Sequence, residues 1–203
     1  MEPYADITSQ YAEFGAHAAG DSPCFEEWCR GVIEDPEVIA WLSTLPIPKR
    51  QPNLVFAAAR WHGVPAPGPY QGLREALLRD DGVIRATIMS RATQTNEVGR
   101  MATLLPAFSS LNPRSGPLAL LEVGPSAGLC LFPDRWGYEW RTDAGVVELG
   151  AEPRLPCRVT GPAPLPSALP QVAWRGGVDL NPLDVRDEDA MAWLEILVYP
   201  EHD

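Results

Sequence analysis

The spacing of apolar residues predicts a series of short helices along the first half of the chain. Between Ile7 and Ala18, apolar or aromatic residues recur at intervals of four, three and four, which places them on one face of a helix over residues 5–19. Asp35 followed by Pro36 is a typical helix start, and prolines at positions 46 and 48 end that helix. Further helices are expected over residues 53–61 and 70–78, and from residue 95 or 96 through residue 108.

The pattern changes after a linker rich in proline and glycine at residues 112–117. Leu118–Val123 is a continuous apolar run, as expected of a strand buried on both faces of a parallel sheet. Residues 127–132 are expected to open a crossover helix that stops at Pro133. The remaining expectations are a hairpin over residues 138–149, a proline-rich surface loop over 153–170, a second strand over 172–180 and a final helix capped by Asp187.

These elements predict an α/β fold in two regions. Residues 1–112 form a helical N-terminal region, and residues 113–203 form a partial Rossmann-like, methyltransferase-like parallel sheet with an inserted β-hairpin. Two parallel strands and a hairpin do not complete such a sheet, because edge strands expose unpaired backbone groups. We therefore expect either a shortened version of the fold or a homo-oligomer or complementing chain at the open sheet edge.

Composition and charge exclude several classes of function. The net charge of −11 argues against nucleic acid as a partner, since phosphate binding needs clustered lysine and arginine. There is no apolar run long enough to span a membrane, and the acidic N-terminus is unlike a signal peptide, so no membrane partner and a cytoplasmic location are expected. The four cysteines and three histidines show no metal-ligand spacing, and no metal site is predicted.

The strongest chemical motif is the glycine-containing turn that follows the apolar run. Its pattern, Glu122-x-Gly124-x-Ser126-x-Gly128, resembles the cofactor loop of S-adenosylmethionine-dependent methyltransferases. The two glycines permit close approach of a ligand, and the following helix start offers free N–H groups. A carboxylate at the strand's carboxyl end suits a cationic ligand, which favours S-adenosylmethionine over a dinucleotide.

Asp179 is predicted to lie at the end of the second strand, where methyltransferases place an acid against the ribose hydroxyls. The spacing from the glycine turn is longer than the usual ~20 residues, so the hairpin and the proline-rich segment must be an insertion. Ser126 also replaces the middle glycine of the methyltransferase pattern, which affects how closely a cofactor can approach.

A polar cluster precedes the expected helix near residue 96. Gln94, Asn96, Glu97 and Arg100 can be interpreted as a substrate-binding wall facing the Glu122 loop, or as ordinary capping of a helix that begins at Thr95 or Asn96. The aromatic segment 134–140 likewise fits either stacking on a planar ligand or packing of the hairpin.

Gly124-x-Ser126-x-Gly128 also matches the nucleophile elbow of serine hydrolases. The acid and base would then be Asp179 or Asp184 and His202. This interpretation is disfavoured because the strands that should precede the serine are missing, and because His202 is the penultimate residue.

Several segments resemble a bacterial family known only as domain of unknown function 2332. They are QPNLVFAAA at 51–59, QTNEVGR at 94–100, LLEVGPSAGL at 120–129, DRWGYEW at 134–140, RGGVDLNPLDV at 175–185 and WLEILVYPE at 193–201. The resemblance supplies no activity. Members of the family are considerably longer, so it implies that further strands are missing here.

The sequence thus favours an S-adenosylmethionine-dependent methyltransferase-like protein acting on an unknown small molecule, with no catalytic residue identified. Whether the chain is an active enzyme is left open. The alternative from another class is a non-catalytic binding or assembly protein that a partner chain completes.

Overall fold

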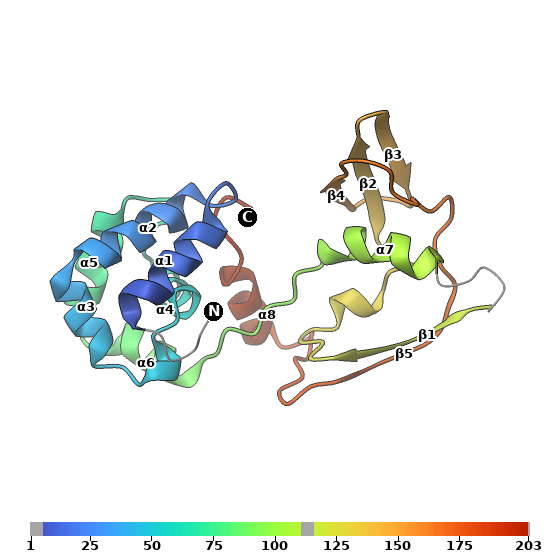
Figure 1. The fold of residues 1–203 in the computed structure, drawn as a ribbon. Coiled ribbons are helices and arrows are strands. Elements are labelled where there is room, and N and C mark those ends of the chain that lie inside the picture. Colours follow the sequence, from blue (N-terminus) through green and yellow to red (C-terminus); the bar gives the residue numbers. More distant parts are fainter. Residues whose placement is uncertain (1–5, 111–115, 203) are drawn as a thin grey trace. The chain divides into compact units, whose positions relative to one another are not determined.

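The computed structural model describes residues 6–110 and 116–202 and shows a mixed α/β protein with a helical N-terminal region (Figure 1). Its contacts divide the chain into a helical unit, residues 1–95 with 188–203, and an α/β unit, residues 96–187. This division differs from the expected ranges 1–112 and 113–203, because the last helix packs with the N-terminal helices. The expected boundary at 112/113 lies outside the described residues.

The helical unit is built from short helices, and the predicted cap at Asp35 is confirmed. The Asp35 carboxylate accepts hydrogen bonds from the N–H groups of Glu37 and Val38, and Pro36 begins the helix. The elements are α1 (Ile7–Ala18), α2 (Pro23–Glu34), α3 (Pro36–Ser43), the 3₁₀ helix η1 (Ile47–Lys49), α4 (Pro52–Trp61), α5 (Tyr70–Leu78), α6 (Val83–Ser90) and α8 (Glu188–Ile196).

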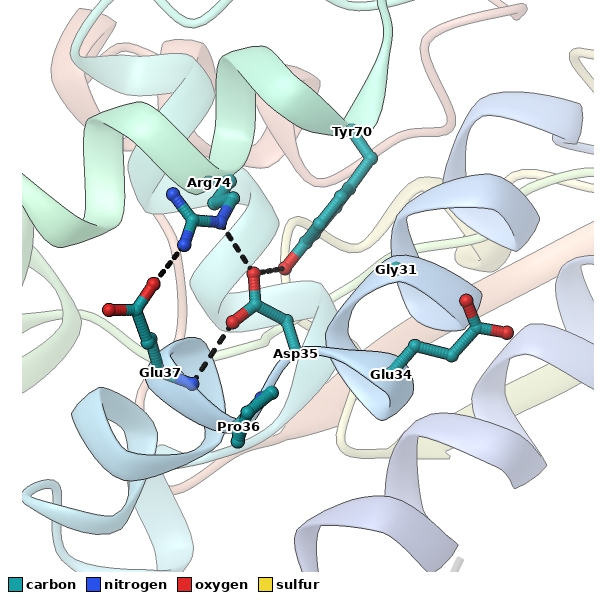
Figure 2. Close-up of a pocket in the computed structure, with 7 residues that line it drawn as sticks. All are labelled: Gly31, Glu34, Asp35, Pro36, Glu37, Tyr70 and Arg74. Atoms are coloured by element: carbon teal, nitrogen blue, oxygen red, sulfur yellow. Dashed lines mark hydrogen bonds and ion pairs between the residues drawn. The ribbon is translucent and has the colours of Figure 1, made fainter.

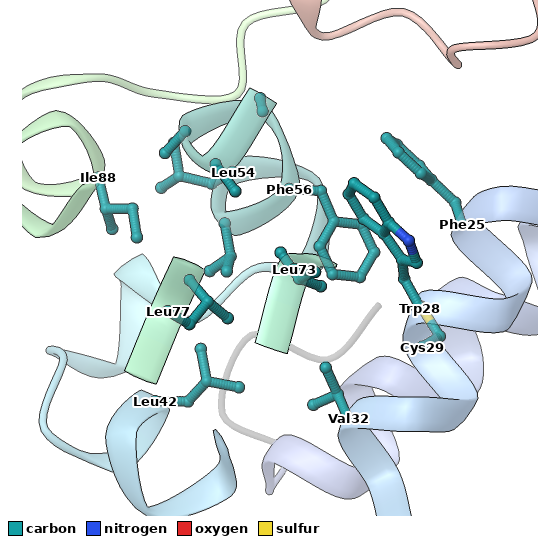
Figure 3. Packing of buried hydrophobic residues seen from close by; sticks show 14 of the residues in the cluster. Phe25, Trp28, Cys29, Val32, Leu42, Leu54, Phe56, Leu73, Leu77 and Ile88 are labelled. Atoms are coloured by element: carbon teal, nitrogen blue, oxygen red, sulfur yellow. The ribbon is translucent and has the colours of Figure 1, made fainter. Parts of the chain in front are cut away.

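Helix α4 forms the centre of this unit. Every residue from Leu54 to Ala59 is buried, so the helix is apolar on all sides and its neighbours surround it. Figure 3 shows the packing around Phe56, whose ring contacts those of Phe25 and Trp28 at centroid distances of 5.0 and 5.2 Å. Such aromatic clusters stabilise a core beyond the area they bury.

Helix α8 is joined to the helical unit by specific polar contacts. The indole of Trp193 donates to the carbonyl of Ala92, and the guanidinium of Arg91 lies over the rings of Trp61 and Trp193 while pairing with Asp189. The contacts of Trp193 and Asp189 link residues about a hundred positions apart. They explain why α8 belongs to the helical unit and not to the α/β unit that precedes it in sequence.

The α/β unit contains two small sheets. Strands β1 (Leu118–Val123) and β5 (Val172–Val178) pair in parallel, and β2 (Gly137–Thr142), β3 (Gly145–Leu149) and β4 (Arg154–Arg158) form a second sheet in the order β3-β2-β4. Helix α7 (Arg100–Ser110) packs against β2 and β4. The core between them holds the stacked rings of Tyr138 and Trp140, so these aromatic residues serve packing and are closed to a ligand.

Four details differ from the sequence expectations. The crossover helix over 127–132 is reduced to the 3₁₀ helix η2 (Leu129–Leu131), and Pro133 lies two residues after its end. The expected loop over 153–170 includes strand β4, which tolerates Pro156 because it lies at the edge of its sheet. The helix expected from residue 95 or 96 begins at Arg100. Strand β1 is exposed on one face instead of being buried on both.

Candidate functional site

The carboxyl ends of β1 and β5 lie side by side and bring the two halves of the predicted site together. Glu122 is opposite Gly177 in the register, and the N–H of Gly124 donates to the carbonyl of Val178 at 2.8 Å. Ligands of open parallel sheets bind at this edge. Glu122 and Asp179 thus belong to one edge, as expected of a shared site.

The turn after β1 depends on residues in the left-handed conformation. Gly124 and Gly128 have φ values of 76° and 75°, and Ser126 has φ 53°, the only positive value of a non-glycine residue in the described chain. A Cβ added at Gly124 would meet no atom within 4 Å, so space remains above the turn. Ser126 is only 4% exposed.

Asp179 holds this turn in place. One carboxylate oxygen accepts the N–H of Ser126 at 2.8 Å, and the other accepts the N–H of Asn181 at 2.9 Å. The N–H of Leu183 donates to the carbonyl of Ser126 at 3.2 Å. The segment after β5 therefore fixes both backbone polar groups of Ser126, which stabilises its unusual φ. Asp179 positions the loop, a role that its place in the sequence did not reveal.

Replacing Asp179 with alanine is expected to destabilise the α/β unit by about 1–3 kcal/mol, because it leaves the N–H of Ser126 without its acceptor. Chemical denaturation measures the loss, and amide hydrogen exchange should show reduced protection at Ser126. Asp184→Ala is the control, since Asp184 is exposed and pairs only locally with Arg186. An equal effect of the two substitutions would show that the loop does not depend on Asp179.

Glu122 is the most unusual charged group of the site. Its Oε2 atom is buried and has no hydrogen-bond partner among the described residues. Burial raises the pKa of this carboxyl above its usual value, and the nearby positive charge of Arg100 acts in the opposite direction. A buried carboxylate oxygen without a donor is costly, and a cationic donor from a ligand would remove that cost.

The polar segment before α7 lies against the glycine turn. The Asn96 side chain accepts the N–H of Leu129 at 2.8 Å, so it contacts the loop and does not cap the helix. Glu97 provides the cap instead, accepting the N–H groups of Gly99 and Arg100 at 2.6 and 2.9 Å. The guanidinium Nε of Arg100 donates to the carbonyl of Glu97, which orients its charge. Asn96 therefore lies against the glycine turn, and the cap that was expected from Thr95 or Asn96 comes from Glu97.

Gln94, the remaining residue of that cluster, falls in the helical unit. The structure adds Cys130, which sequence analysis considered only as a metal ligand. Its buried thiol receives the Asn96 side-chain amide and donates to the carbonyl of Glu97, each at 3.6 Å. Burial, and secondarily the charge of Glu122, raise the pKa of this thiol. In the sequence, the one indication that Cys130 belongs to this site was its position two residues after Gly128 of the turn.

The segment after η2 is fixed to β5 by a two-pronged ion pair. Arg175 donates to both carboxylate oxygens of Asp134 at 3.0 Å, and its guanidinium lies 4.6 Å from the ring centre of Phe132. This geometry is the strong form of an arginine–carboxylate contact. The ion pair holds the segment after η2 against the sheet face that carries Arg175. Its two residues are 41 positions apart, too far for the sequence pattern to indicate the contact.

The residues of the serine hydrolase interpretation are not assembled around Ser126 in the α/β unit. The Ser126 Oγ atom is buried and has no partner among the described residues. Asp179 binds the loop amides, and Asp184 pairs with Arg186. His202 belongs to the helical unit, where its ring contacts Tyr199. This geometry lends the nucleophile interpretation no support.

A surface pocket of about 490 Å³ in the helical unit is a second place to look for a site (Figure 2). Asp35 accepts hydrogen bonds from the Tyr70 hydroxyl and from Arg74, which also pairs with Glu37. These groups satisfy one another and support the start of α3. Within residues 6–110 and 116–202, no group of three or more acidic, cysteine or histidine side chains is arranged to hold a metal ion.

None of the helices in the described ranges has the length and apolar character needed to cross a membrane. Comparisons with curated proteins and with solved structures found no match. One family profile does match, that of an uncharacterised protein conserved in bacteria, DUF2332, and it covers residues 8–203. Because the match spans nearly the whole chain, the protein belongs to the DUF2332 family.

Proposed function

We propose that the edge formed by β1 and β5 binds S-adenosylmethionine and that the protein is a methyltransferase-like member of its family acting on a small molecule. The observation that carries this proposal is the buried, unpartnered carboxylate oxygen of Glu122, immediately before a turn with two glycines in the left-handed conformation. A Rossmann-like origin of the β1–β5 sheet is part of the same proposal. It is supported by the parallel pairing and by the place of the turn.

The charges around the turn match the amino-acid part of this cofactor. Glu122 offers an acceptor for an ammonium group, and Arg100 is an exposed guanidinium close enough to influence the Glu122 carboxyl. A ligand that carries an ammonium and a carboxylate on one carbon would pair with both residues by charge-assisted hydrogen bonds. Asn96 contributes by fixing the turn at Leu129, and Asp179 by fixing it at Ser126.

When bound, S-adenosylmethionine supplies an electrophilic methyl group on a sulfonium centre. The residues of this chain would bind and orient it, and methyl transfer can proceed by such positioning without a dedicated acid–base pair. The four cysteines are all free thiols, which fits the cytoplasmic location that we propose with this function.

Titration calorimetry with S-adenosylmethionine and with its demethylated product tests the proposal. Both ligands are expected to bind, whereas adenosine alone should bind at least about tenfold more weakly, because it lacks the ammonium and carboxylate groups that Glu122 and Arg100 would recognise. Absence of heat, together with no thermal shift at millimolar ligand, would exclude this cofactor. Equal binding of adenosine would remove the role given to the two charged residues.

A second candidate is a non-catalytic binding or assembly protein. The observation that favours it is the exposed apolar face of the β1–β5 sheet, which includes Leu121 and Val123. Ligand binding without methyl transfer to any small-molecule acceptor would support this candidate over an enzyme.

A further inference from the structure

Asn96 joins the polar segment before α7 to the segment that follows the glycine turn. Its side-chain oxygen accepts the N–H of Leu129 at 2.8 Å, and its side-chain amide donates to the buried thiol of Cys130 at 3.6 Å. One side chain thus uses both its acceptor and its donor on two consecutive residues of η2, which lie 33 and 34 positions further along the chain. Asn96 therefore fixes the segment that carries it against η2.

The backbone carbonyl of Glu97, the next residue, accepts two side chains at once. These are the thiol of Cys130 at 3.6 Å and the guanidinium Nε of Arg100 at 2.9 Å. The Glu97 carboxylate also accepts the N–H groups of Gly99 and Arg100. A Cβ added at Gly99 would lie 2.5 Å from that carboxylate, so glycine permits this close approach. The position of the Arg100 guanidinium therefore depends on where the Glu97 carbonyl lies.

Glu122 lies on the same face of the β1–β5 sheet as η2. Alternation along β1 places it with the half-buried Leu118 and Leu120, and η2 packs against both strands. The Oε2 atom of Glu122 is buried without a partner among the described residues. Burial raises the pKa of this carboxyl, and the charge of Arg100 lowers it by a smaller amount. The effect of one charge on another falls with distance, so it depends on what holds the guanidinium in place.

We propose that Asn96 is a positioning residue, which holds the Arg100 guanidinium near Glu122 by fixing the Glu97 carbonyl against η2. In its consequence for ligands, this role rests on the function proposed above. A ligand with an ammonium and a carboxylate on one carbon binds best when the partners of both groups are already in place. Asn96 would thereby favour ligands that carry both charges over ligands that carry neither.

NMR titration of the Glu122 side-chain carboxyl, assigned with Glu122→Gln, tests this role on the whole chain without a ligand. Asn96→Ala should raise the pKa of Glu122, because the guanidinium of Arg100 is released, and Arg100→Gln should raise it for the same reason. The double variant should show no rise beyond that of Arg100→Gln alone. Thr103→Ala is the control, since Thr103 is exposed on the same helix, and it should leave this pKa unchanged.

A purely structural role of Asn96 would give a different result. Loosening of η2 would admit water to Glu122 and lower its pKa, because the cost of burying the carboxylate would fall. The proposal is overturned if Asn96→Ala lowers this pKa or leaves it unchanged, or if the rise persists in the Arg100→Gln background. Chemical denaturation of each variant completes the test, since unfolding of the α/β unit by Asn96→Ala would make Asn96 a residue of the fold and also overturn the proposal.

Calorimetry separates this role from the cofactor proposal. Asn96→Ala is expected to weaken the binding of S-adenosylmethionine at least about tenfold and to leave that of adenosine within about twofold, since adenosine lacks both charged groups. If the wild type binds no S-adenosylmethionine but the pKa of Glu122 responds as expected, the cofactor proposal fails and the positioning role stands. If the wild type binds it and Asn96→Ala changes neither the affinity nor the pKa, the positioning role fails and the cofactor proposal stands.

Discussion

Replacing Trp140 with alanine is expected to destabilise the α/β unit by about 3–5 kcal/mol, the usual cost of removing a fully buried aromatic side chain. Trp140 is 1% exposed and stacks on Tyr138 with ring centres 5.3 Å apart. Its indole donates to the buried carbonyl of Ala102 at 2.8 Å, so the substitution also leaves an acceptor on α7 unpaired. Both losses act on the contact between α7 and β2, which positions the polar segment beside the glycine turn.

Trp174→Ala is the matched control for this prediction. The same residue type is removed from the same unit, but Trp174 is 55% exposed and its loss should change stability by no more than about 0.5 kcal/mol. Denaturation followed by near-ultraviolet circular dichroism measures both variants, and hydrogen exchange assigns the change to residues 96–187. Similar losses for the two variants would contradict the packing that the structure shows.

Replacing Glu122 with glutamine is expected to weaken binding of S-adenosylmethionine about 10- to 100-fold, because it removes a charge-assisted hydrogen bond of about 1.5–3 kcal/mol. Calorimetry measures the affinity, and Glu148→Gln is the control, since it removes the same charge from an exposed position in the same unit. Unchanged affinity in Glu122→Gln, or an equal loss in Glu148→Gln, would reject Glu122 as a ligand-binding residue.

The same substitution has a predictable effect on the unbound protein. Burial raises the pKa of Glu122 in the folded state above its ordinary value of 4.5, so the folded state binds this proton more tightly than the unfolded state does. The ionised carboxylate therefore destabilises the fold above its raised pKa, and this cost disappears as the pH falls below 4.5. Glu122→Gln should be more stable than wild type at pH 7 and equally stable at pH 4, as measured by chemical denaturation.

A carboxylate that costs stability when unbound and gains a partner on binding is typical of a functional residue. If Glu122→Gln instead lowered stability at pH 7, Glu122 would be a structural acceptor. Loss of affinity without a change in stability at either pH would keep the binding role but show that burial of the carboxylate is not costly.

Much of the local structure follows from the sequence, because its causes are local. The apolar run Leu118–Val123 is a strand with those bounds, and Tyr70–Leu78 is a helix with the bounds expected. Asp35 caps the helix that Pro36 begins. The glycines of the turn after β1 have the positive φ values for which glycine is suited. Each of these features depends on residues within one or two turns of chain.

The predictions that were wrong concern features that depend on residues far apart in the sequence. Strand β4 lies in a proline-rich stretch that was predicted to be a loop, and it forms because β2 offers it a pairing edge. The last helix was predicted to belong to the sheet region, but its Trp193 and Asp189 bind residues about a hundred positions earlier. The apolar pattern of β1 was correct for a strand, yet the pattern cannot state whether one face or both are covered. That depends on which segments pack against it.

The sequence by itself therefore determined the family, the helical first region, the parallel strand with its glycine turn, and the acids at both strand ends. Only the tertiary structure decided what those acids do. Asp179 reaches back 53 residues to hold Ser126, and Glu122 is left with a buried oxygen that no described residue satisfies. The tertiary structure also leaves one face of strand β1 exposed. Burial and long-range hydrogen bonding are properties of neighbours in space, and the order of residues along the chain does not specify those neighbours one by one.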